Sequence, residues 1–200
     1  MVPNLIPPLI TAALVLVGLA VPAPSQTDSD ALALLPFRDG VEQYLALHQQ
    51  AEASAPVVPV PTDAASLYVV PAALRTQLQR VRAGTPEGKI FTPRAGRVFK
   101  RLIAQVTGGD YAALMIATHE DRDELGRAVV NERWPGSAVT TMPPDLLAVL
   151  PPLPSALEYR FVHRDLVLWD VRADLIVDVL RDAIPLQGGE RGTGRRARRN

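Results

Sequence analysis

One stretch near the C-terminus, Leu157–Leu180, constrains this chain more than any other, because its apolar residues fit a single strand pattern across two turns. Side chains alternate between the two faces of a strand, so a register wrong by one residue would scatter the apolar residues. Pairing Val162 with Asp165 and Asp170 with Leu175 gathers them instead. We therefore predict a three-strand antiparallel meander with strands at 157–162, 165–170 and 175–180.

This register places most of the apolar residues on one face, which only Asp170 interrupts. That face is expected to pack on the rest of the domain, and it holds Leu157, Tyr159, Phe161, Leu166, Leu168, Leu175, Val177 and Val179. The opposite face is mixed, and it is more apolar than a solvated face would be. We expect a helix of the same chain or a partner to cover part of it; its residues are Glu158, Arg160, Val162, Asp165, Val167, Trp169, Ile176, Asp178 and Leu180.

Helical spacing of apolar residues predicts several helices before the meander. Thr92 followed by Pro93 is a helix start, because a threonine caps the first N–H groups and proline suits the first helical position. The chain is therefore predicted to be an α+β protein, with N-terminal helices packed on a small antiparallel C-terminal sheet. The helical pattern of the first helix spans Leu32–Gln50, with Pro36 expected as its start and Gly40 as a break. Further helices are expected from Asp63 or Pro71 to Arg82, from Pro93 to Gly108, at about Asp110–Glu124 and, as a short helical turn, from Pro143 to Leu150. A short strand is expected at Ala128–Asn131.

The first 25 residues carry no charged side chain and contain an apolar run from Leu9 to Val21. This pattern is typical of a signal peptide, with Ala23 and Ser25 at the positions that signal peptidase recognises. We expect cleavage after Ser25 and a periplasmic or secreted protein. Because no lysine or arginine precedes the apolar run, the alternative is an uncleaved N-terminal membrane anchor over Leu5–Val21.

Composition predicts one domain over 26–186, with a stiff proline-rich linker at 55–62 inside it and a disordered Gly- and Arg-rich tail at 187–200. Without that tail the chain has 16 basic and 20 acidic residues, so it lacks the basic excess of a nucleic-acid-binding protein. It has no cysteine, which excludes disulfides, thiolate metal sites and cysteine nucleophiles. We expect no cofactor, and membrane contact only through the N-terminal segment.

The chain has no common catalytic or nucleotide-binding motif. We expect His48 on the polar side of the first helix and His163 exposed in a hairpin turn. The acidic run His119–Glu124 lacks metal-ligand spacing and is typical of a solvated helix end. Asp170 and Asp174 flank one turn, where two carboxylates could work as a hydrolytic pair, although aspartates there ordinarily bind the N–H groups of the turn.

Arg160, Trp169 and Asp178 share the mixed face in the predicted register, with Trp169 on the central strand. Arginine and tryptophan are enriched at the energetic centres of protein interfaces, so these three residues form the candidate partner-binding site. The simpler alternative is a surface ion pair beside a tryptophan that packs under a helix.

Four segments resemble a group of uncharacterised exported bacterial proteins. They are QYLALH (Gln43–His48), GKIFTP (Gly88–Pro93), TMPPDLLAVLPPLP (Thr141–Pro154) and LEYRFVHRDLVLWDVRADLIVDVLRDAIP (Leu157–Pro185), the last being the most specific. The resemblance implies no activity, so no catalytic residue follows from it. Members of the group often have glycine where His163 stands, which suits a tight turn better and weakens any catalytic role for His163.

These observations predict a non-enzymatic binding domain of the cell envelope with a protein partner. One alternative is an extracytoplasmic hydrolase that uses aspartates and arginines near the turn at 170–178. Another is a carrier for a small apolar ligand, held in a cavity between the helices and the sheet. An exposed patch around Trp169 favours binding, a polar cluster in a deep pocket favours the hydrolase, and a closed apolar cavity favours the carrier.

Overall fold

The computed structural model describes residues 26–54, 69–108, 126–135 and 142–184. The predicted signal peptide, the proline-rich linker, the expected helix at 110–124 and the C-terminal tail lie outside these ranges. Within the described ranges, no helix is both long enough and apolar enough to cross a membrane.

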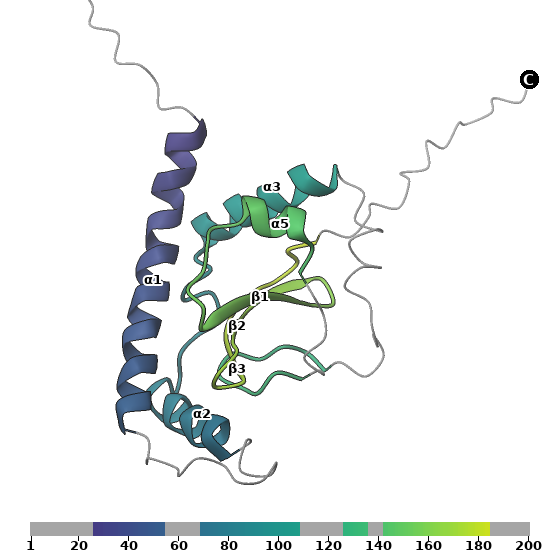
Figure 1. The fold of residues 1–200 in the computed structure, drawn as a ribbon. Coiled ribbons are helices and arrows are strands. Elements are labelled where there is room, and N and C mark those ends of the chain that lie inside the picture. The colour runs from purple at the N-terminus through teal and green to yellow at the C-terminus, as the bar shows by residue number, and fades with distance from the viewer. Residues whose placement is uncertain (1–25, 55–68, 109–125, 136–141, 185–200) are drawn as a thin grey trace, which may run out of the picture.

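The fold is α+β, as predicted (Figure 1). The strands form one antiparallel sheet in the order β1-β2-β3, and α1 runs along one side of the molecule with α3 and α5 near one of its ends and α2 near the other. The elements are α1 (Gln26–Ser54), α2 (Val69–Val81), α3 (Pro93–Thr107), α5 (Pro144–Val149), β1 (Leu157–Val162), β2 (Asp165–Asp170) and β3 (Leu175–Leu180).

Helix α1 is longer than predicted, because Pro36 and Gly40 lie inside it and neither starts nor breaks it. A proline removes one helical hydrogen bond, but tertiary packing supplies most of the stability of a protein helix. Phe37 and Tyr44, on the inner face of α1, are both buried. A side chain at Gly40 would have its Cβ 3.2 Å from Cγ1 of Ile90, so glycine allows the helix to approach the loop before α3 closely.

The predicted ends of α3 are confirmed. Oγ1 of Thr92 accepts a hydrogen bond from the backbone N–H of Ala95 at 3.3 Å, with Pro93 as the first helical residue. Gly108 ends the helix in a left-handed conformation with φ 59°, which glycine adopts without steric cost.

The strands occupy the predicted ranges, and the register between β1 and β2 is the predicted one throughout. Between β2 and β3 the prediction was wrong beyond the turn, because Leu168 pairs with Asp178 instead of Val177. An extra residue in one strand, a β-bulge, produces such a shift. Asp178 and Leu180 therefore lie on the core face, and Val179 lies on the opposite face.

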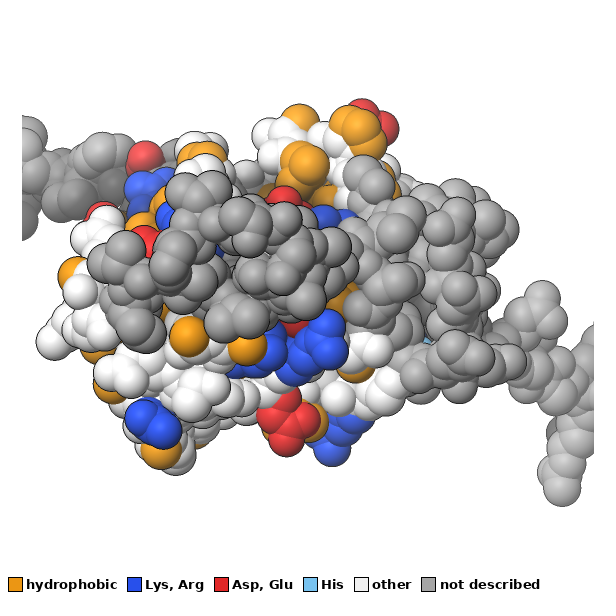
Figure 2. Space-filling model, turned by 60° about the horizontal axis from the view of Figure 1, so that its bottom comes forward, with side chains coloured by type: hydrophobic (Ala, Val, Ile, Leu, Met, Phe, Trp, Pro, Cys, Tyr) orange, Lys and Arg blue, Asp and Glu red, His pale blue; other side chains and the backbone are white. Residues whose placement is uncertain are grey.

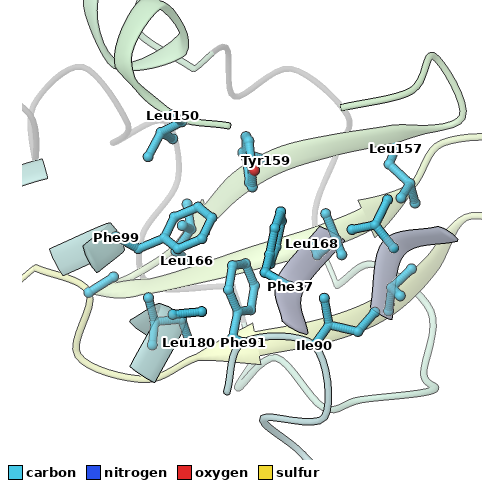
Figure 3. Packing of buried hydrophobic residues seen from close by; sticks show 14 of the residues in the cluster. Phe37, Ile90, Phe91, Phe99, Leu150, Leu157, Tyr159, Leu166, Leu168 and Leu180 are labelled. Carbon is cyan, nitrogen blue, oxygen red and sulfur yellow. The ribbon is translucent and has the colours of Figure 1, made fainter. Parts of the chain in front are cut away.

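The main core lies between the helices and one face of the sheet. Four aromatic rings from four elements meet there, with centroid separations of 4.9 to 5.7 Å (Figure 3). Rings at these separations and inclinations attract each other beyond the effect of apolar burial alone. The four residues are Phe37 of α1, Phe91 of the loop before α3, Phe99 of α3 and Tyr159 of β1.

A second apolar cluster covers the opposite face of the sheet, where the sequence predicts a helix of the same chain or a partner. A segment of the same chain without a helix or strand, residues 126–135, lies there instead. It exchanges two backbone hydrogen bonds of 2.8 Å with Ile176, through Asn131 and Glu132, and has no regular strand at 128–131. The cluster comprises Ala128, Trp134, Val162, Val167, Trp169, Ile176 and Val179.

The contact between α3 and β3 generates a first prediction. A Cβ at Gly96 would lie 2.8 Å from Cδ1 of Leu180, so Gly96→Ala forces that leucine to move. Overpacking outweighs the better helix propensity of alanine, and we expect the free energy of unfolding in urea to fall by about 1 kcal/mol. In a Leu180→Ala background the same change should be neutral or stabilising, and an equal loss in both backgrounds would contradict the contact.

Candidate functional site

The three residues predicted to share the mixed face lie on two different faces. Arg160 and Trp169 do lie together, with the guanidinium carbon 5.2 Å from the centroid of the Trp169 ring. Asp178 does not join them, because the bulge in β3 turns its side chain into the core. The prediction that all three residues share one face is therefore wrong, whereas their predicted role in partner binding stays a prediction.

Trp134 belongs to the segment at 126–135 that covers this face of the sheet, and it lies beside Trp169 where Asp178 was expected. Its ring centroid lies 5.6 Å from that of Trp169, and each tryptophan is 5% exposed. Within the described ranges, neither indole N–H has a hydrogen-bond acceptor. Arg160 donates to Glu158 through Nη2 at 2.5 Å. Trp169 is thus covered as half of an aromatic pair, and the exposed Trp169 patch that would favour binding is not found among the described residues. No sequence pattern indicated a role for Trp134.

Asp178 is held by a loop that wraps around its carboxylate. Four backbone N–H groups donate to it at 2.6 to 2.9 Å, three of them from the segment between α2 and α3. Burial raises the pKa of Asp178, and these hydrogen bonds act in the opposite direction. The residue therefore fixes the loop at 88–91 to β3, with donors from Gly88, Ile90, Phe91 and Val179.

Asp170 is the second buried carboxylate, and it joins β2 to the first helix. It accepts hydrogen bonds from Oη of Tyr44 and Nδ1 of His48, each at 2.5 Å. The backbone N–H groups of Arg172 and Ala173 donate to it at 2.9 and 2.8 Å. The turn chemistry expected for this aspartate is present, but the two bonds to α1 were not predicted.

His48 is buried, so its predicted place on the polar side of α1 was wrong. Besides the contact with Asp170, its Nε2 lies 3.2 Å from Oε1 of Glu52, one helical turn further on, although without hydrogen-bond geometry. Glu52 in turn lies 2.9 Å from Nη1 of Arg172. The imidazole is therefore enclosed between two carboxylates.

Arg82, directly after α2, lies between the two buried aspartates. Its Nη2 donates to the carbonyl of Val177 at 2.6 Å, and its guanidinium lies over the ring of Tyr44. Burial lowers the pKa of Arg82, whereas burial and the charge of Asp170 raise the pKa of Tyr44. The arginine supplies the positive charge that two buried carboxylates require.

The proposed pair of Asp170 and Asp174 has separate partners. Asp174 accepts hydrogen bonds from Nε of Arg133 at 2.6 Å and from Nη1 of Arg75 at 3.3 Å.

His163 is exposed in its turn, as predicted, with a φ of 54°. The run at 119–124 lies outside the described residues, among which no cluster of His, Asp or Glu could hold a metal ion.

Comparisons with protein-family models, with curated proteins and with solved structures find no match to this chain. The interpretation of its site therefore depends on geometry and chemistry. The resemblance to exported bacterial proteins stays a prediction.

The Asp170 contact generates a second prediction. Asp170→Asn leaves Tyr44 and His48 without their anionic acceptor, and we expect the free energy of unfolding to fall by about 3 kcal/mol. Tyr44→Phe should cost about 1 to 2 kcal/mol by itself and markedly less in the Asp170→Asn background. A double-mutant cycle in urea measures this coupling, and additive losses would contradict the bond.

A third prediction concerns pH. Because burial raises the pKa of Asp178, its ionised form is less favourable in the folded than in the unfolded chain. Its contribution to stability is therefore greatest below the ordinary aspartate pKa and is lost as pH rises through the raised value. Between about pH 7 and about pH 4, the wild type should gain stability relative to Asp178→Asn as pH falls. Urea unfolding of both proteins at several pH values tests this. A difference in the free energy of unfolding that does not change with pH, or that changes in the opposite direction, would contradict the prediction.

Proposed function

We propose that the protein is a non-enzymatic binding domain of the cell envelope, and that its binding face is formed by Arg160, Trp169 and Trp134. The observation that carries this proposal is that Arg160 lies over Trp169, which pairs with Trp134, and that neither indole N–H has an acceptor among the described residues. Arginine and tryptophan contribute disproportionately to binding energy at interfaces. Export is supported by the apolar, uncharged segment at the N-terminus.

The burial and hydrogen bonding of the aspartates argue against the hydrolase alternative. Asp170 and Asp178 are completely buried, and each accepts four hydrogen bonds from this chain. A general acid or base must reach the proton that it transfers, directly or through one water. Asp174 is less buried, but two arginines bind it. These aspartates serve the fold.

The filled core argues against the carrier alternative. A carrier needs a cavity between the helices and the sheet. In that place the rings of Phe37, Phe91, Phe99 and Tyr159 contact one another (Figure 3). Binding at the other face of the sheet requires no such cavity.

A fourth prediction tests the binding face. The tagged full-length chain is incubated with envelope extract from the cells that produce it, beside Arg160→Gln and the control Arg97→Gln, an exposed arginine of α3. We expect one component to be enriched by the wild type and by Arg97→Gln but at least about tenfold less by Arg160→Gln. Equal enrichment by all three, or by none, would contradict the proposed face.

A further inference from the structure

We infer that the face of Arg160, Trp134 and Trp169 recognises a carboxylate group of its ligand. This inference rests on the proposed function and specifies the chemistry of that site. The three side chains offer only donors, because a guanidinium and an indole N–H cannot accept a hydrogen bond. An ionised carboxylate is the complementary group, since it only accepts and carries the opposite charge to arginine.

The two indole N–H groups are the first observation. Each tryptophan is 5% exposed, and neither Nε1 has an acceptor among the residues that the structure describes. Buried donors without acceptors are rare and destabilising in folded proteins. Both donors belong to one ring pair with centroids 5.6 Å apart, so a ligand group that binds beside the pair has two unsatisfied donors close by.

The second observation is that Arg160 already holds a carboxylate on this face. Its Nη2 lies 2.5 Å from Oε2 of Glu158, and the Glu158 side chain is 45% exposed whereas that of Arg160 is 13% exposed. The glutamate is thus the solvent-side partner of a more deeply placed guanidinium. A ligand carboxylate can replace the Glu158 carboxylate there, because the guanidinium of Arg160 would again bind a carboxylate.

The same arginine lies against one of the two indoles. Its guanidinium lies over the Trp169 ring, 5.2 Å from the centroid. A ligand carboxylate that binds Arg160 in place of Glu158 would therefore lie close to the indole pair.

The tryptophan count gives a direct experiment on the full-length chain. The sequence has two tryptophans, and both belong to this pair, so a ¹H–¹⁵N correlation spectrum contains two indole signals, both from the proposed site. Sodium acetate is titrated against sodium chloride at equal ionic strength. We expect saturable shifts of both signals with acetate at about millimolar to 100 mM concentrations. If neither signal moves beyond the chloride control, the inference is overturned.

A short peptide with a free C-terminal carboxylate, and the same peptide amidated, then identify the source of the group. We expect the amidated peptide to leave the indole signals unchanged. Binding of the free-acid peptide at least about tenfold tighter than acetate assigns the site to peptide termini, and equal binding assigns it to small carboxylates. Equal shifts with the acid and the amide would overturn the inference.

Two variants separate ligand recognition from a structural role. Glu158→Gln removes the competing carboxylate and should lower the acetate Kd several-fold, whereas Arg160→Gln should raise it at least about tenfold. Glu132→Gln, an exposed glutamate of the covering segment, is the matched control and should change nothing. Weaker binding in Glu158→Gln would overturn the exchange. A partner captured from envelope extract without any indole response would leave the binding domain standing and refute only the carboxylate.

Discussion

The fold depends on one buried carboxylate, that of Asp170, because it joins the N-terminal helix to the turn between the last two strands. Its partners Tyr44 and His48 precede it by 126 and 122 residues. A buried charge is costly unless donors and an opposite charge surround it, and here two side chains, two backbone N–H groups and nearby Arg82 do so. That requirement fixes α1 against the sheet and thereby closes the aromatic core.

A second buried carboxylate extends the same constraint to the other side of Arg82. Asp178 gathers the backbone N–H groups of the loop at 88–91, and Arg82 binds the adjacent carbonyl of Val177. Both carboxylates thus accept hydrogen bonds from groups of the chain that hold the helices and loops on the sheet. On the opposite face of the sheet, the indole N–H groups of Trp134 and Trp169 are buried without an acceptor among the described residues.

Much of the fold could be predicted because its determinants are local. Alternation in the last strands, the Thr92-Pro93 cap and the proline-bounded turn at α5 each depend on neighbours in sequence. The candidate site was less predictable. A bulge in β3 shifts the pairing by one residue and moves Asp178 to the other face. Alternation alone assumes an uninterrupted ladder, so it could not reveal this, and nothing near Trp134 indicated that it would pack on Trp169.

The sequence by itself determined the α+β class, the three strands, their turns and the start of α3, since hydrophobic periodicity and capping chemistry are properties of short segments. Tertiary structure decided what the polar residues do. His48 was expected to face solvent, and Pro36 was expected to start a helix; packing placed the histidine beside Asp170 and carried α1 through the proline. A buried polar group must find its partners in space, and several of those partners lie 87 to 126 positions away, which no local pattern records.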